Sequence, residues 1–171
     1  MLQRDPQDVL LLGGPVIGRG RAPDGTWELR ALHDGAGVEG GSDSLHLYIA
    51  FGQPDGLAAG GLGCGGVGFA NDQRPVVLSL SGHGPKTSLC YVGQVVRSAT
   101  RVGLGLTDGT STEASVLHAE LPVNLWVAFT DGSAVPTEIR AYDDRRQLRL
   151  LSIDEDWPAP GSSSCWGPID E

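Results

Sequence analysis

The dipeptide Asp-Gly occurs five times in this chain, beside segments in which apolar and polar residues alternate. The copies begin at Asp24, Asp34, Asp55, Asp108 and Asp131. A type I′ hairpin turn requires positive φ at both central residues, and Asp followed by Gly adopts that conformation at little cost. The recurring pair therefore predicts short antiparallel strands joined by tight turns.

The segments around these turns alternate with the two-residue period of a β-strand. This period places one face of each strand on a core and the other face toward water. The polar-side positions, which include Tyr48 and Trp126, are therefore expected to face outward. The predicted inward rows are Trp27/Leu29/Ala31, Leu45/Leu47/Ile49/Phe51, Val102/Leu104/Leu106 and Val123/Leu125/Val127/Phe129, with shorter rows at Ile139/Ala141 and Leu148/Leu150.

The composition supports an all-β chain. The sequence has 26 Gly and 11 Pro among 171 residues, which disfavours long helices. Residues 52–66 are so rich in glycine that they are predicted to form a long loop. Residues 75–81 and 87–96 return to strand character. Altogether the pattern predicts about nine strands in a single antiparallel β-sandwich that spans residues 1–153.

Three pieces of the C-terminal third, residues 100–110, 124–129 and 136–144, carry a family resemblance. They resemble the last strands of bacterial immunoglobulin-like domains, especially uncharacterised actinobacterial versions that an Ala-Tyr-Asp hairpin closes. The resemblance implies an immunoglobulin-like sandwich and implies no reaction. The chain departs from antibody domains because no Trp lies between Cys64 and Cys90. Since about 50 residues cannot close a sandwich alone, the N-terminal strands are expected to complete the same core.

The charge of the chain argues against two classes of partner. The formal net charge is −9, and Lys86 is the only lysine. The densest basic group, Arg145, Arg146 and Arg149, stands among acidic residues that cancel its field. We therefore expect no binding to nucleic acid or to anionic membranes. No segment approaches the roughly 20 apolar residues that span a bilayer.

The apolar run at residues 9–17 lacks the features of a signal peptide. It follows Arg4, Asp5 and Asp8 instead of a basic start, and no small-residue cleavage site comes after it. The run is predicted to be an ordinary strand. If Met1 is the native start, the protein is expected in the cytoplasm.

The three cysteines, Cys64, Cys90 and Cys165, are too few for a disulfide framework. Cys64 and Cys90 would form a disulfide in an oxidising compartment if their strands pair. The other interpretation is that both are small buried hydrophobic residues.

Several local patterns resemble functional motifs without meeting their requirements. Residues 61–66 satisfy Gly-x-Gly-x-x-Gly, but no helix start follows to receive a pyrophosphate. In the segment 82–87, Pro85 stands directly before Lys86, where a phosphate loop needs a backbone amide. Ser79 and Ser81 lie near His83 but outside any Gly-x-Ser-x-Gly motif. The histidines lack the close spacing of structural zinc modules: His33, His46, His83 and His118. We therefore predict no catalytic residue, no cofactor and no metal site.

The tail, residues 154–171, combines acidic residues, prolines and serines with two of the four tryptophans, Trp157 and Trp166. Large apolar side chains in such a segment would serve as anchors on a protein partner. Alternatively, both tryptophans fold back over an open end of the same domain and bury apolar area there.

The leading functional hypothesis is a non-enzymatic binding or assembly module whose partner is a protein. The tail and the glycine-rich loop are its candidate surfaces, and exposed strand edges would allow a homo-oligomer. The alternative is a carbohydrate or small ligand bound by the outward aromatics Tyr48, Tyr91 and Trp126. The third hypothesis is a hydrolase on a β scaffold, which would need a base and a nucleophile in one cleft.

Overall fold

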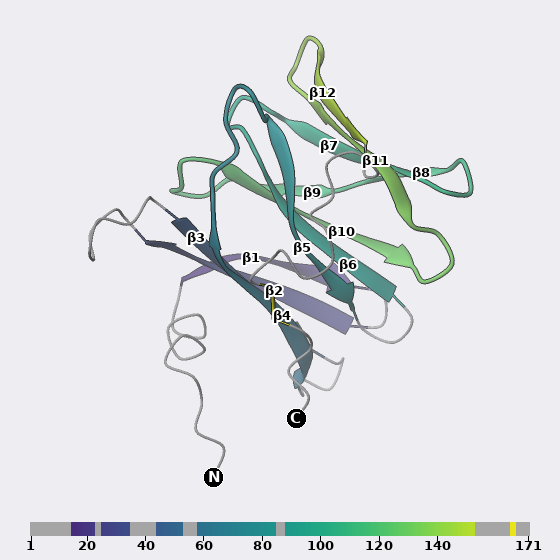
Figure 1. The fold of residues 1–171 in the computed structure, drawn as a ribbon. Coiled ribbons are helices and arrows are strands. Elements are labelled where there is room, and N and C mark those ends of the chain that lie inside the picture. The colour runs from purple at the N-terminus through teal and green to yellow at the C-terminus, as the bar shows by residue number, and fades with distance from the viewer. Residues whose placement is uncertain are drawn as a thin grey trace.

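A computed structural model of the chain describes residues 15–22, 25–34, 44–52, 58–84, 88–152 and 165–166. These residues form strands joined by turns, and among them no helix is present that could cross a membrane (Figure 1). The strands are β1 (Val16–Ala22), β2 (Gly25–Asp34), β3 (Ser44–Gly52), β4 (Ala58–Val67), β5 (Val76–His83), β6 (Ser88–Val95), β7 (Arg101–Leu106), β8 (Ser111–Glu113), β9 (Ser115–Leu117), β10 (Asn124–Asp131), β11 (Pro136–Tyr142), β12 (Gln147–Ser152) and β13 (Cys165–Trp166).

The strands form three antiparallel sheets. Sheet A has the order β1-β2-β3-β4-β13, sheet B has β5-β6-β10-β9, and sheet C has β12-β11-β7-β8. The chain passes from sheet C to sheet B at Ala114, between β8 and β9. The predicted all-β antiparallel fold is confirmed. The strand count is higher than the nine expected, and a third sheet was not anticipated from the sequence.

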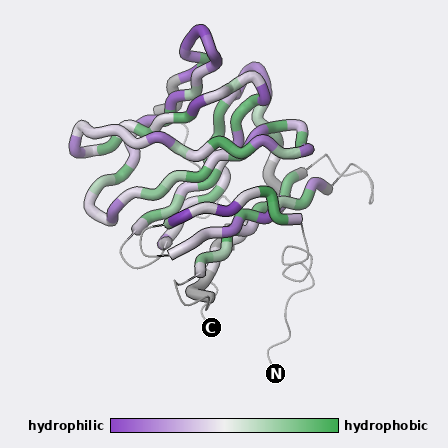
Figure 2. Tube along the Cα trace, turned by 180° about the vertical axis from the view of Figure 1, so that it is seen from behind, coloured by the Kyte–Doolittle hydropathy of each residue, from purple (hydrophilic) through white to green (hydrophobic). Residues whose placement is uncertain are grey.

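Sheet B is the middle layer, since each of its faces contacts a separate apolar cluster (Figure 1). The A–B cluster contains the predicted inward rows of β2 and β3, with Leu80, Cys90, Val92, Leu125 and Val127 from sheet B. The B–C cluster joins Val76, Tyr91, Val95, Trp126 and Ala128 to Val102, Leu104, Ile139 and Ala141 of sheet C. Figure 2 shows the same distribution, with hydrophobic residues along the middle strands and hydrophilic ones at the β11–β12 turn.

The third sheet overturns one part of the alternation argument. Tyr91 and Trp126 were expected to face outward, but their exposed fractions are 4% and 0%. Sheet C covers that face of sheet B, and the Trp126 indole Nε1 donates to the carbonyl of Gln94 at 3.2 Å. Because this hydrogen bond satisfies the polar end of the indole, Trp126 can be buried without cost from an unpaired N–H group. Its position on the outward side of the alternation therefore did not mean exposure to water.

The predicted glycine-rich loop at 52–66 is the second correction, because most of it forms β4 in sheet A. Glycine is needed there because Tyr48 of β3 lies across the strand. A Cβ at Gly61 would lie 2.6 Å from the Tyr48 hydroxyl and 2.8 Å from the carbonyl oxygen of Ile49. The glycines therefore allow a close approach between strands and need not indicate an irregular loop.

The Asp-Gly pair at Asp108 forms a turn of a different type from the one predicted. Gly109 has φ of 83°, and its amide donates to the carbonyl of Leu106 at 3.0 Å. The amide of Leu106 donates to the carbonyl of Thr110 at 2.9 Å. This is a three-residue hairpin loop with glycine in the left-handed region. Among the described glycines, only Gly109 has positive φ. The tight-turn role of this Asp-Gly pair is confirmed, while the two-residue type I′ geometry is not found here.

The C-terminal segment returns to the body of the protein at one point. β13, which lies within the tail, pairs with β4 at the edge of sheet A. Trp166 therefore lies in sheet A by its backbone, while Trp157 lies outside the described residues.

Candidate functional site

A cavity of about 680 Å³ opens where one end of sheet A meets sheet B. Four separate segments line it: the start of β1, the end of β2, the turn after β6 and the connection after β9. The lining residues are Pro15, Val16, Ile17, Ala31, Leu32, His33, Arg97, His118, Ala119, Glu120 and Leu121. The volume lies within the range of ordinary ligand pockets.

The floor of the cavity is apolar and belongs to the core. Ala31 and Leu121 are members of the A–B cluster, with exposed fractions of 2% and 7%, and Ile17 and Ala119 pack against it. An apolar group placed on this floor would therefore contact side chains that the fold already holds in place.

The rim is polar and carries both signs of charge. His33, Arg97, His118 and Glu120 are all exposed at its edge. The guanidinium is a donor only, the carboxylate of Glu120 is an acceptor, and a neutral imidazole offers one of each. The rim can thus satisfy a bound group that both donates and accepts hydrogen bonds.

Hydrogen bonds hold part of this rim in position. Arg97 Nη1 donates to the carbonyl of Leu121 at 2.6 Å, which ties the turn after β6 to the connection after β9. The buried Asn124 donates from Nδ2 to the carbonyl of Arg97 at 3.3 Å. On the other side, His33 packs edge-on against Phe69, with ring centroids 5.1 Å apart. These contacts reduce the freedom that binding would otherwise remove.

The lining of the cavity carries a small set of titratable side chains. It holds two imidazoles, one guanidinium and one carboxyl, and none of the residues that line it is Ser, Thr or Cys. His33, His83 and His118 are exposed and His46 is half-buried. The described residues contain no group of three side chains that would hold a metal ion.

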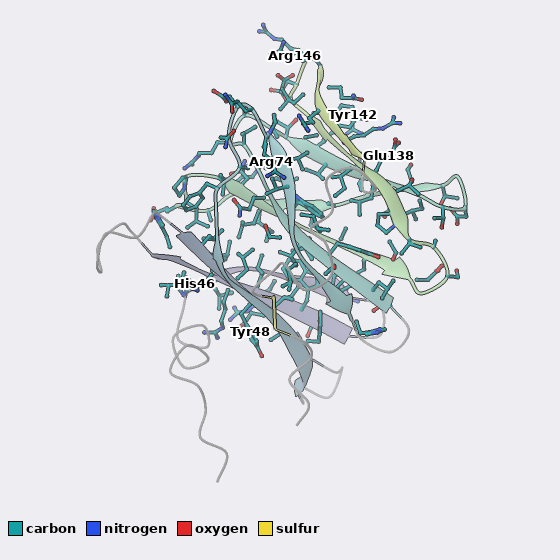
Figure 3. The ribbon with its side chains drawn as sticks, in the orientation of Figure 1. His46, Tyr48, Arg74, Glu138, Tyr142 and Arg146 are labelled. Carbon is teal, nitrogen blue, oxygen red and sulfur yellow. The ribbon has the colours of Figure 1, made fainter. Side chains whose placement is uncertain are left out.

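The outer face of sheet A has charges that are already paired with one another. Glu28 accepts from Arg19 Nε at 2.8 Å and from Arg30 Nη2 at 2.8 Å. The hydrogen bond from Arg19 is the main cause that lowers the pKa of Glu28, and the bond from Arg30 lowers it further. Figure 3 shows His46 and Tyr48 on this side of the molecule, with Glu138 and Tyr142 on the opposite side, in sheet C.

The cysteines are distributed over two sheets. Cys90 lies in β6 as a free, fully buried thiol whose pKa is raised by burial. The condition set for a disulfide between Cys64 and Cys90, that their strands pair, is not met: β4 pairs with β3 and β13, and β6 pairs with β5 and β10. For Cys90, the interpretation as a small buried hydrophobic residue agrees with its place in the core.

Comparisons with family models, with curated proteins and with solved structures find no match to this chain. The choice of the cavity as the candidate site therefore depends on the geometry of this structure alone. Sequence reasoning named His33 and His118 only among scattered histidines, and it missed Arg97 and Glu120. No local motif links the four segments, so only the packing of sheet A on sheet B brings them together.

Proposed function

We propose that this protein is a non-enzymatic binding module that docks a short extended segment of a protein partner at the cavity. One observation carries the proposal: an apolar floor lies beneath a rim that offers both donors and acceptors. A peptide has the matching chemistry, since an apolar side chain would fill the floor while its backbone N–H and C=O groups bond to the rim.

The neighbouring strand edge supports a peptide as the occupant. Val16 and Ile17 line the cavity and begin β1, which is the edge strand of sheet A. Among the described residues, β1 pairs only with β2. An extended segment can add to such an edge through main-chain hydrogen bonds while a side chain enters the adjacent pocket.

Two other ligand classes fit this geometry less well. A carbohydrate platform of Tyr48, Tyr91 and Trp126 would need three exposed rings, but Tyr91 and Trp126 are buried. A net charge of −9 disfavours nucleic acid, which binds through clustered cations.

The proposal is tested by affinity purification from the native host with the full chain as bait. The variants Arg97→Ala and His118→Ala alter exposed rim residues. Because Arg97→Ala also removes the bond to the carbonyl of Leu121, the circular dichroism spectrum of each variant is compared with that of the wild type to verify the fold. The matched control is Arg145→Ala, an exposed arginine on the turn between β11 and β12. The expected result is a partner that the wild type and Arg145→Ala capture and that both rim variants lose at least tenfold.

Two outcomes would contradict the proposal. A partner retained equally by both rim variants would place the interface elsewhere on the protein. The second is a bait that captures only further copies of this chain, with a mass by light scattering that rises with concentration. That result would mark the β1 edge as a self-association surface instead.

A further inference from the structure

Two cysteines that lie far apart in the sequence meet at the edge of sheet A. In the antiparallel pair β4–β13, Cys165 lies directly opposite Cys64 and Trp166 lies opposite Gly63. The pairing of Cys165 with Cys64 therefore brings two cysteine residues to one register position of the ladder.

The spacing of an antiparallel ladder suits a disulfide. Residues directly opposite each other have Cα atoms about 4.5–5.5 Å apart. Disulfide-bonded cysteines usually have Cα atoms about 4.4–6.8 Å apart. The Cα spacing expected at this register position therefore falls within the usual range for a disulfide.

The remaining cysteine, Cys90, lies outside this strand pair. Cys90 is a free thiol in the core, opposite Phe129 of β10 and Gly82 of β5. Cys64 lies opposite Leu47 of β3, whose side chain is fully buried on the inner side of sheet A. Leu47, Cys64 and Cys165 therefore share one register position across three neighbouring strands.

The shortness of β13 is a second argument for a covalent link. Among the described residues that follow β12, two pair with β4, namely Cys165 and Trp166. The few backbone hydrogen bonds of such a pair scarcely offset the conformational entropy lost when the segment is ordered. A covalent bond would hold the segment in place where hydrogen bonding alone is too weak.

We propose that Cys64 and Cys165 form a cross-strand disulfide that fastens the C-terminal segment to β4. The oxidant is a low-molecular-weight or protein disulfide. One cysteine thiolate attacks that disulfide, which releases one thiol and leaves a mixed disulfide. The second thiolate then attacks the protein sulfur and releases the other thiol. Two protein S–H bonds are lost, one S–S bond forms, and the oxidant leaves as two reduced thiols.

The bond would close a ring that contains every strand of sheets B and C. All strands from β5 to β12 lie between the two cysteines in the sequence. A ring of this size constrains the unfolded chain strongly. The inference is independent of the cavity, because neither cysteine lines it.

The test is thiol mapping of the full chain. Native protein is incubated with excess oxidised glutathione, blocked with N-ethylmaleimide, and analysed by intact mass and by unreduced peptide mapping. We expect wild type to lose two thiols and to yield a peptide that links Cys64 to Cys165. Cys90→Ala should form the same link, while Cys165→Ser should form no intramolecular bond.

A thermal measurement adds a second readout. Oxidation should raise the Tm of wild type and Cys90→Ala by about 5–15 °C, and it should leave the Tm of Cys165→Ser unchanged. Three outcomes of thiol mapping would overturn the proposal, and each can be observed with the wild-type protein without any variant. They are three thiols that remain free, a linked peptide that contains Cys90, and a glutathione adduct that persists on Cys64 or Cys165.

Discussion

At the scale of single residues, Gly93 shows how closely the middle sheet is packed. It lies in β6 opposite Trp126 of β10 and Leu78 of β5. A Cβ at this position would lie 2.1 Å from the carbonyl oxygen of Val77 and 2.4 Å from the indole of Trp126. Neither group can move away freely, since one is backbone and the other is fully buried.

We therefore predict that Gly93→Ala destabilises the protein by about 2 kcal/mol or more, because the added methyl overpacks the core. Urea unfolding measures the change. Gly103→Ala in β7 is the matched control, since the nearest atom to its added Cβ would lie 4.0 Å away. That control should be neutral or slightly stabilising. Equal losses for both variants would contradict the packing argument.

A second residue-scale prediction concerns Asp108 at the β7–β8 turn. Its carboxylate accepts from the Thr110 hydroxyl at 2.6 Å and from the Thr110 amide at 2.9 Å. Both hydrogen bonds lower the pKa of Asp108, and the bond from the Thr110 hydroxyl has the larger effect. Because the folded pKa lies below the unfolded one, this group stabilises the fold above its unfolded pKa. That stability is lost as the pH falls through the folded pKa.

Thr110→Val removes the hydroxyl donor, so the pKa of Asp108 should rise toward its ordinary value. NMR titration of the carboxyl carbon measures this shift directly. Asp143, whose carboxylate accepts from the amides of Arg145 and Arg146, serves as the internal control and should titrate unchanged. An Asp108 titration that is identical in wild type and Thr110→Val would refute the assigned cause.

At the scale of elements, one side chain anchors the connection between β4 and β5. Gln94 of β6 is fully buried and bonds to this connection at two places. Its Nε2 donates to the carbonyl of Gly68 at 2.9 Å, and its Oε1 accepts from the amide of Ala70 at 3.0 Å. The link holds the chain where it crosses from sheet A to sheet B.

Gln94→Met keeps the approximate volume but leaves both backbone groups without this partner. We expect a loss of about 1–3 kcal/mol and faster hydrogen exchange at the Ala70 amide. Gln73→Met, at an exposed position of the same connection, is the control and should change neither. Unaltered exchange at Ala70 in Gln94→Met would show that the connection is held by other contacts.

At the scale of the whole molecule, sheet B is a common wall for two apolar layers. Leu125 of the A–B cluster and Ile139 of the B–C cluster are both essentially inaccessible to solvent, at 0% and 1% exposure. Since neighbouring residues of β10 face opposite layers, loss of packing on one side should weaken the other.

Leu125→Ala and Ile139→Ala should each cost about 2–5 kcal/mol and should each shift one single unfolding transition. Differential scanning calorimetry distinguishes this from independent layers. Val135→Ala, at a side chain with 46% exposure, should change stability very little. Two calorimetric transitions, of which each core variant moves only one, would mean that the layers fold separately.

Much of the local structure followed from the sequence alone. Period-two alternation predicted the inward rows of β2 and β3, which are buried as expected. The Asp-Gly pair at Asp108 marked a turn. These features are readable because the direction of a strand side chain, and the tolerance of a residue for a turn, depend on its own backbone and near neighbours. The immunoglobulin-like resemblance and the protein partner stay predictions.

Only the tertiary structure decided what covers each face of each strand. Alternation separates the two faces of β10, but it cannot say that sheet C covers the face that carries Trp126. In the same way, only the pairing with β3 shows that most of residues 52–66 form a strand, in which a Cβ at Gly61 would crowd Tyr48. The cavity and the Cys64–Cys165 register both join segments far apart in the chain. Such contacts depend on which surfaces meet after folding, and no local pattern in the sequence records that choice.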